Sequence, residues 1–343
     1  MKHLLNTLFV TSQDIYLSLD GENVTAKRDK IVVARYPLHT LQGIVTFSYL
    51  GASPALMGAC AEREVSLAFC TPQGKYLARV AGIVGGNVLL RREQYRVADN
   101  KEQSCSIARN MIVGKLYNAR WSLERTKRDH PDRIDESDFE NAIQIIKSQM
   151  TIAKDISKLD SLRGTEGVAA SAYFNVFDQM ILRNKKEFFF HGRNRRPPLD
   201  NVNALLSFAY SLLANECASA LESVGLDAYV GVMHQERPGR KSMALDLMEE
   251  MRPIIADRVV LTVINNRIIA PNDFEKEGSG AVRMVESGRK KFLKAWQERK
   301  QESIMHPYLQ EKMNWGLVPY VQAMLLARHL RGDIDAYPPF LWK

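Results

Sequence analysis

The spacing of hydrophobic residues changes once along this chain, near residue 100, and this change limits the folds that the chain can adopt. Up to about residue 97, β-branched and aromatic residues form short runs separated by turn residues, which is typical of strands. From Ser104 onward apolar residues recur at helical spacing, starting with Ile107 and Met111. We therefore predict an α+β multidomain protein, in which a small β domain (1–97) precedes a larger all-α domain (98–343).

Turn residues and further periodic segments add detail to this division. Asp20-Gly21 and residues 72–74 each separate two strand-like runs, as the turns of hairpins do. In the first part only residues 53–62, rich in Ala, Leu and Met, are predicted to be helical. The polar residues 96–103 are predicted to link the two parts. After a long first helix, we expect helices over residues 138–158, 162–182, 201–223, 243–264, 289–300 and 317–330.

Charge and cysteine content restrict the class of protein. Lys and Arg outnumber Asp and Glu by 47 to 39, so a polyanionic partner and a merely solvated basic surface both stay open. The four cysteines form no CxxC pair, which argues against a zinc knuckle or a disulfide framework and favours the reducing cytosol. No stretch approaches the roughly 18 consecutive apolar residues that span a bilayer. We therefore predict a cytoplasmic protein without a membrane partner.

The sequence Leu-Arg-Gly-Thr-Glu-Gly over residues 162–167 offers the first candidate metal ligand, Glu166. We predict that it opens a helix. Gly164 and Gly167 remove side chains that would otherwise shield its carboxylate from a ligand. A glutamate in a first helical turn can also serve only to stabilise the helix dipole. Taken alone, Glu166 leaves both interpretations open.

The second candidate is His234, which ends the apolar run that starts at Tyr229 and leads into a loop with Gly, Pro and basic residues. An imidazole in that position suits a metal held near a phosphate. A lone histidine is more often structural, so this signal also needs support from elsewhere in the chain.

The third candidate segment carries two carboxylates. Asp246 and Glu249 are three residues apart in a predicted helix and share one of its faces. Glu250 points about a quarter turn away, so Glu249 is the better ligand. Pro253 removes a backbone donor and is predicted to bend the helix just after this face.

Together, two carboxylates and an imidazole from three segments match the ligand preferences of Mg²⁺ or Mn²⁺. Such an ion polarises a phosphodiester and lowers the pKa of a bound hydroxyl or water, which suits phosphoryl transfer on DNA.

Basic residues lie near these segments. Residues 183–196 contain six Lys or Arg against one acid, with Phe188 to Phe190 between them. We expect these phenylalanines to lie in the core rather than to stack on bases. Our predicted phosphate contacts come from this run and from the loop after His234: Arg195, Arg196, Arg237, Arg240 and Lys241.

Taken in order, four segments resemble the CRISPR-associated integrase family that inserts new spacers into a repeat array. The resemblance spans essentially the whole chain and rests on residues 162–167, 195–207, 229–234 and 244–250. Residues 17–24 and 337–342 look like the branch of this family found in type I-C systems.

The resemblance implies a dimerising β domain, a catalytic α-helical domain and metal ligands at Glu166, His234 and Glu249. Many relatives have aspartate where this chain has Glu249. Asp246 matches a second acidic position of the family and is a further catalytic candidate. Arg252 falls where relatives carry a basic residue near the site, and we add it to the predicted DNA contacts. The implied partners are double-stranded DNA of the protospacer and the repeat array, a second copy of the chain, and a small ferredoxin-like CRISPR-associated protein.

In this family the 3′-hydroxyl of an incoming DNA fragment attacks a phosphodiester at the edge of a repeat, and water can replace that hydroxyl. Three functions therefore follow as hypotheses: a metal-dependent DNA endonuclease and integrase of CRISPR adaptation, a stand-alone branched-DNA nuclease, and a noncatalytic DNA-binding scaffold. A scaffold has no need of the three metal ligands together, so loss of strand cleavage with intact DNA binding excludes it.

Overall fold

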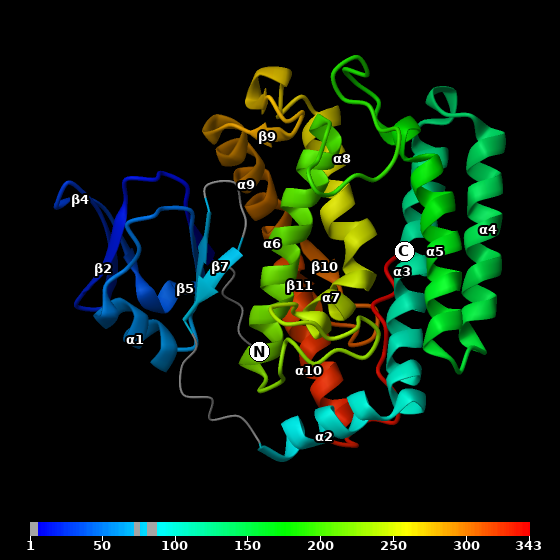
Figure 1. The fold of residues 1–343 in the computed structure, drawn as a ribbon, viewed down its shortest axis with the longest axis horizontal. Coiled ribbons are helices and arrows are strands. Elements are labelled where there is room, and N and C mark those ends of the chain that lie inside the picture. Colours follow the sequence, from blue (N-terminus) through cyan, green and yellow to red (C-terminus); the bar gives the residue numbers. More distant parts are fainter. Residues whose placement is uncertain (1–5, 72–75, 81–87) are drawn as a thin grey trace.

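Strands and helices separate along the chain as the hydrophobic spacing predicts (Figure 1). The computed structural model describes residues 6–71, 76–80 and 88–343. Its N-terminal part holds two sheets, and its larger part is a packed group of helices. The predicted α+β class is confirmed.

The first sheet of the N-terminal part has four strands in the order β1-β5-β6-β7. The first three run parallel and β7 is antiparallel to β6. Their bounds are Asn6–Val10, Leu41–Thr46, Ser66–Cys70 and Tyr76–Arg79. The short turn η1 (Leu38–Thr40) precedes β5, and α1 (Pro54–Glu62) connects β5 to β6.

The second sheet is antiparallel and is built from β2 (Tyr16–Asp20), β3 (Asn23–Arg28) and β4 (Ile31–Pro37). The predicted hairpin turn at Asp20-Gly21 is confirmed, with Gly21 at φ +57° and β2 paired to β3. The other predicted turn, residues 72–74, lies outside the described residues.

Helix α2 (Val88–Asp99) corrects the prediction for the end of the N-terminal part, because it occupies residues that we expected in a β domain. Its buried residues Leu90, Gln94 and Val97 are spaced for one helix face. Gln94 Nε2 donates to the carbonyl oxygens of Asp227 (2.8 Å) and Val230 (3.0 Å). The predicted boundary at residue 97 therefore falls inside a helix that packs on the helical part.

The predicted link over residues 96–103 is also wrong, since it contains only a break between two helices. Asn100 caps the next helix, and its side chain accepts hydrogen bonds from the backbone N–H groups of Glu102 and Gln103.

Eight further helices form the larger part, with α3, α4 and α5 side by side along one edge (Figure 1). The bounds are α3 Lys101–Asp129, α4 Glu136–Lys154, α5 Leu159–Asn175, α6 Asn201–Ser223, α7 Ser242–Met248, α8 Arg258–Asn265, α9 Glu286–Gln301 and α10 Val318–Leu330. The predicted helix over 201–223 is confirmed to the residue. Short helical turns lie between these helices: η2 Pro131–Arg133, η3 Phe177–Met180, η6 Pro271–Asp273 and η7 Trp315–Leu317.

The larger part is not all α, because it contains two short antiparallel hairpins. They pair β8 (Phe274–Lys276) with β9 (Val282–Met284), and β10 (Ser303–Met305) with β11 (Lys312–Asn314). Strands of three residues carry too little periodicity for a sequence pattern to show them.

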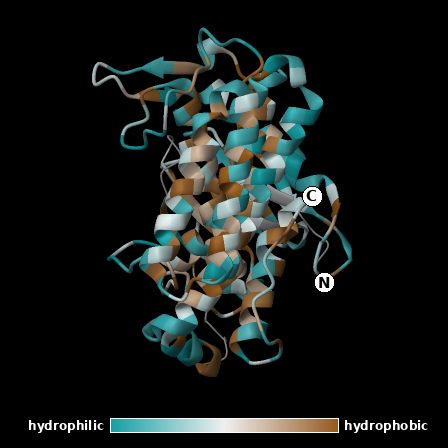
Figure 2. Ribbon diagram, turned by 90° about the vertical axis from the view of Figure 1, so that its right-hand side faces the viewer, coloured by the Kyte–Doolittle hydropathy of each residue, from teal (hydrophilic) through white to brown (hydrophobic). Residues whose placement is uncertain are grey.

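Helix α6 is the central helix of the larger part. Among the described helices it alone is long and apolar enough to cross a membrane, but 67% of that window is buried inside the fold, as in a core helix. Hydrophobic residues, brown in Figure 2, run along the packed helices, whereas the peripheral loops are mostly hydrophilic. Phe188 and Phe190 are buried as expected, while Phe189 is 36% exposed.

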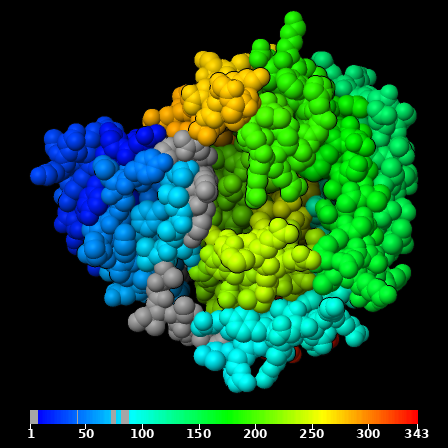
Figure 3. All heavy atoms as spheres, viewed as in Figure 1, coloured from blue at the N-terminus to red at the C-terminus, as the bar shows by residue number. Residues whose placement is uncertain are grey.

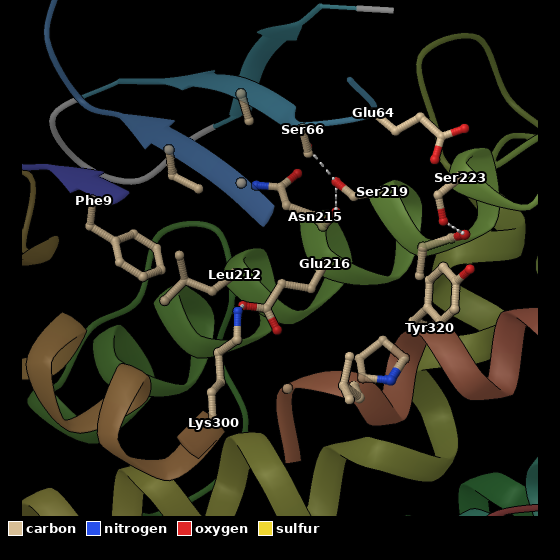
Figure 4. A pocket seen from close by; sticks show the side chains of 17 residues that line it. Phe9, Glu64, Ser66, Leu212, Asn215, Glu216, Ser219, Ser223, Lys300 and Tyr320 are labelled. Atoms are coloured by element: carbon tan, nitrogen blue, oxygen red, sulfur yellow. Dashed lines mark hydrogen bonds and ion pairs between the residues drawn. The ribbon is translucent and has the colours of Figure 1, made fainter. Parts of the chain in front are cut away.

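The first sheet faces α6 and α10 across a cavity of about 160 Å³ (Figure 4). Ser66 Oγ and Ser219 Oγ are hydrogen-bonded at 2.9 Å across this boundary. Deeper in, Lys300 Nζ donates to Glu216 Oε1 at 2.8 Å. Phe47 and Cys70 of the N-terminal part belong to the hydrophobic core of the helical part, so the two parts share packing.

The C-terminal residues after α10 have no regular structure, yet Tyr337 and Phe340 are buried (Figure 1). Asn118 of α3 holds this tail: its Nδ2 donates to the carbonyl oxygens of Glu250 (2.7 Å) and Phe340 (2.8 Å), and its Oδ1 accepts from the Trp342 N–H (2.9 Å). The tail thereby becomes part of the helical core.

Candidate functional site

Glu166 lies in the middle of α5, about two turns after its first residue, Leu159. The predicted position in a first turn is therefore wrong, and the alternative that it serves the helix dipole fails because that effect is confined to the terminal turns. A side chain placed at Gly164 or Gly167 would meet nothing within 4 Å. Both glycines therefore border open space, and their role in exposing the carboxylate stays a prediction.

Hydrogen bonds to Asp246 fix the position of His234. Its Nδ1 lies 2.5 Å from Asp246 Oδ1, and the His234 backbone N–H donates to the same oxygen at 2.9 Å. The N–H groups of Val232 and Met233 donate to Asp246 Oδ2 at 2.7 and 2.9 Å. This arrangement leaves Nε2 of His234 directed into the site, as carboxylates do for metal-bound histidines.

The loop can wrap around Asp246 only because residue 231 is glycine. A Cβ at Gly231 would lie 2.7 Å from Ser242 Cβ and 2.8 Å from Asp246 Oδ2, which is closer than atoms can approach. Asp246 was predicted as a second carboxylate facing the site. Instead both of its oxygens accept hydrogen bonds from the His234 loop, so it positions the histidine.

Glu249 lies where the helix changes its hydrogen-bond pattern. Helix α7 is followed by the 3₁₀ turn η4 (Glu249–Met251), the π-helical turn η5 (Arg252–Asp257) and then α8. Pro253 lacks a backbone donor, which accounts for the irregular turn and agrees with the predicted bend. Glu249 Oε1 lies 3.0 Å from Arg252 Nη2 and 3.8 Å from His234 Nε2.

Lys115 of α3 is a site residue that the sequence pattern did not reveal. Its ammonium donates to Glu166 Oε1, and it lies 2.7 Å from Glu249 Oε2. Burial acts to lower the pKa of Lys115, but the charges of Glu249 and Glu166 outweigh it, so this pKa is raised. A lysine inside a long helix has no distinctive pattern in sequence, because lysine on a helix is usually exposed.

The charges around Glu249 keep it ionised although it is only 3% exposed. Burial acts to raise its pKa, but Arg252, Lys115 and His234 together lower it to about 2. Its Oε2 has no well-directed hydrogen bond, in spite of the close ammonium. The Lys115 ammonium is therefore the cation that offsets the burial of this oxygen.

The residues fit a divalent ion in their chemistry, although they are not spaced as a ready-made cage. One ammonium nitrogen contacts both carboxylates, so Glu166 and Glu249 face a common point. Within the described ranges, no three His, Cys, Asp or Glu side chains stand at ligand spacing around one centre. Two carboxylates and one imidazole Nε2 suit Mg²⁺ or Mn²⁺, and Lys115 stands where such an ion would neutralise them.

The predicted DNA contacts divide into three groups. Arg195, Arg196 and Arg237 are exposed on loops, and Arg240 is half-buried. Figure 3 shows the surface hollowed between the loop of residues 181–200 and the loop of residues 224–241. These arginines remain available to a polyanion.

Lys241 and Arg252 do not lie on that outer surface. Lys241 Nζ donates to Asn215 Oδ1 at 3.3 Å near the N-terminal part, where burial and the charge of Arg79 lower its pKa to about 8. Arg252 is inside the site and is paired with Glu249. Tertiary packing, which a local charge count does not include, determines these positions, and contact of either residue with DNA stays a prediction.

Arg193 belongs to the basic run of residues 183–196, but it was not among the predicted phosphate contacts. Its guanidinium and that of Arg252 lie over the ring of Tyr210, at 5.2 and 5.1 Å from the centroid. The Tyr210 hydroxyl donates to Asp257 at 2.7 Å. Arg193, Tyr210 and Arg252 therefore connect the loop of residues 181–200 to the carboxylate of Glu249.

Comparison with known proteins supplies a family for this arrangement. Residues 8–298 match the sequence profile of the family described as "CRISPR associated protein Cas1". The chain is 49% identical to "CRISPR-associated endonuclease Cas1 1" of Chlorobaculum tepidum over 343 residues, which cover the whole of both chains.

Solved structures agree on the fold. A casposase bound to its integration product superposes with a TM-score of 0.84 at 22% identity, over 98% of this chain and 94% of that one. A chain of a Cas6-RT-Cas1–Cas2 complex gives 0.81 at 22% identity, over 100% of this chain and 36% of that one.

Proposed function

This chain belongs to the Cas1 family of CRISPR-associated endonucleases and acts as an endonuclease and integrase of CRISPR adaptation, and on that premise we propose that Glu166, His234 and Glu249 hold its catalytic ion. The observation that carries the proposal is the meeting of the two carboxylates at one point, beside an imidazole whose other nitrogen is fixed by Asp246.

The side chains of this site have separable roles. Asp246 orients His234 so that Nε2 is presented to the ion. Arg252 and Lys115 offset the charge of the carboxylates in a buried place. When bound, Mg²⁺ or Mn²⁺ would polarise the phosphodiester and promote deprotonation of the attacking hydroxyl. We propose that Arg252 and Arg193, whose guanidiniums both lie over Tyr210, contact the phosphate that is attacked.

We propose that one site serves two reactions. With the 3′-hydroxyl of a spacer fragment as nucleophile, the product is a new strand junction at the edge of a repeat. With water as nucleophile, the product is a cut strand, which is the branched-DNA nuclease alternative. Both break the same P–O bond, and both require the carboxylates.

The proposed partners are duplex DNA, a second copy of the chain and a small ferredoxin-like protein, in the cytoplasm. Dimerisation through the N-terminal part is supported by β4, where Ile31, Val33 and Tyr36 are 70%, 50% and 38% exposed. A Cas2 partner is supported by the similar chain solved in a Cas1–Cas2 complex. The type I-C-like branch rests on residues 17–24 and 337–342.

The test of the metal site is Glu166→Gln with Glu236→Gln as matched control, since Glu236 is exposed on the loop after His234. Strand cleavage and strand transfer with Mn²⁺ should fall at least about 100-fold in Glu166→Gln only. DNA affinity measured with chelator present should stay unchanged. Equal activities in the two variants would refute the site and would not exclude the scaffold hypothesis, because the cleavage could then not be assigned to these residues.

A strand-transfer assay separates integrase from nuclease. The target is a duplex with one repeat, and the donor is a protospacer-like duplex ending in a 3′-hydroxyl or in a 3′-deoxy control. We expect branched product with the hydroxyl donor alone. Cleavage of the target with either donor, without any branched product, would favour the stand-alone nuclease.

A further inference from the structure

Three arginines from different elements converge on one indole near the end of the chain. The guanidinium of Arg125, on α3, lies 3.5 Å from the ring centroid of Trp342. Those of Arg258, at the start of α8, and Arg299, on α9, lie 5.7 and 5.8 Å from the same centroid. This guanidinium cluster, Arg125, Arg258 and Arg299, is separate from the carboxylate site and has no role in the proposed reaction.

The positive charge of the cluster is poorly compensated. Arg299 pairs with Glu302, but its Nε is buried without a hydrogen-bond partner. In the part of the chain that the structure describes, Arg125 and Arg258 have no hydrogen bond or ion pair with an oxygen acceptor. The nearby Asp129 is already paired with Arg128 at 2.7 Å.

Burial and the neighbouring positive charges both disfavour the charged form of Arg125. Burial, and then the charges of Arg258, Arg128 and Arg299, lower the pKa of Arg125 to about 10. Trp342 provides a flat surface that holds the guanidiniums, but an indole cannot neutralise them. An anion bound between them would relieve both the repulsion and the unpaired donors.

We propose that the guanidinium cluster around Trp342 is a binding subsite for a backbone phosphate of DNA. The planar donors of arginine match two oxygens of a phosphodiester, and Arg258 is exposed so that a strand can reach it. Lys115 and Arg125 are ten residues apart on α3, which corresponds to about 15 Å. A strand that runs along α3 therefore meets the subsite about four nucleotides from the carboxylates.

The subsite rests on DNA as the substrate under Proposed function, and its test is a binding measurement that needs no metal. The variant is Arg125→Gln with Arg258→Gln, and the control is Lys154→Gln with Lys158→Gln, which removes the same charge. Ile156, between the control lysines, accepts hydrogen bonds from Cys105 and Arg109, which places them at the opposite end of α3.

Fluorescence anisotropy with a duplex that carries 3′ overhangs gives the affinity at several salt concentrations in the presence of chelator. The slope of log K against log salt should become shallower by about 0.9 for each phosphate that the protein no longer neutralises, hence by about 1–2 in the variant. The affinity near 0.1 M salt should fall roughly tenfold or more. The control should change the slope much less.

A slope in the variant equal to that of the control overturns the subsite while leaving the proposed function intact. If the unaltered protein does not bind DNA, both fail together. Another outcome is that the variant loses binding to an oligoglutamate peptide while its DNA binding is unchanged. That result overturns DNA as the ligand and points to an acidic protein. Should the double variant not fold, Arg258→Glu alone, at an exposed position, must show the same decrease in slope.

Discussion

Replacing Lys115 by glutamine tests the electrostatic account of the site most directly. The ammonium is 12% exposed and contacts Glu249, which is 3% exposed, and Glu166, which is 21% exposed. Removing one partner of a buried ion group costs about 3–5 kcal/mol. Arg252 continues to hold Glu249 at 3.0 Å, and Glu166 is partly solvated. We therefore expect a smaller decrease of about 2–3 kcal/mol in the free energy of unfolding.

Thermal unfolding with chelator present measures this decrease. A change of that size should lower the Tm of a protein of 343 residues by roughly 3–4 °C. Added Mn²⁺ should then raise the Tm of Lys115→Gln more than that of the unaltered protein, because an ion can neutralise the same carboxylates. A Tm shift with chelator but no added effect of Mn²⁺ would show that Lys115 is structural only.

Lys127→Gln is the matched control, since Lys127 is on the same helix and also pairs with two glutamates, Glu136 and Glu140, each at 3.0 Å. Those pairs are largely exposed, and exposed pairs contribute little. If the two variants unfold at the same temperature, burial does not set the strength of the Lys115 contacts and the electrostatic account is refuted.

Two other substitutions test the surroundings of the site. Asp246→Asn should weaken Mn²⁺ binding about 10–100-fold, because His234 loses the carboxylate that orients it; unchanged affinity in calorimetry would contradict this role. Asp257→Asn should flatten the pH dependence of stability. Burial raises the pKa of Asp257 from 3.8 to about 6, in spite of hydrogen bonds from Tyr210 and Tyr173. The folded state therefore holds this proton more tightly, and roughly 3 kcal/mol that is fully present below about pH 4 is lost as the pH rises through 6. Urea unfolding at several pH values measures it, and parallel curves for both proteins would count against the assignment.

The sequence pattern was sufficient to predict the helices that bury a regular apolar face. Helix α6 is an example, because Asp200 caps it and its apolar residues repeat to its end. Helix α2 was missed because its buried face includes Gln94, whose amide is satisfied by carbonyl groups more than a hundred residues away. The spacing of Leu90, Gln94 and Val97 was the available signal.

For the candidate site, residue types and motifs placed Glu166, His234 and Glu249 in one group, and the structure brings them together. Sequence alone could not distinguish a metal ligand from a residue that orients a ligand, so Asp246 was predicted to face the site. Lys115 and Asn118 lie on one helix and have no motif of their own. Their importance depends on partners that are distant in sequence, which no local periodicity contains.

The buried tail has a consequence for the order of synthesis. Asn118 holds the carbonyl of Glu250, the neighbour of Glu249, together with the backbone of Phe340 and Trp342. Before residues 340–342 have been translated and have packed against α3, the segment that carries Glu249 lacks this clamp. We expect a nascent chain to acquire an ordered catalytic segment only after these residues have been added, so that partly made chains have no nuclease activity.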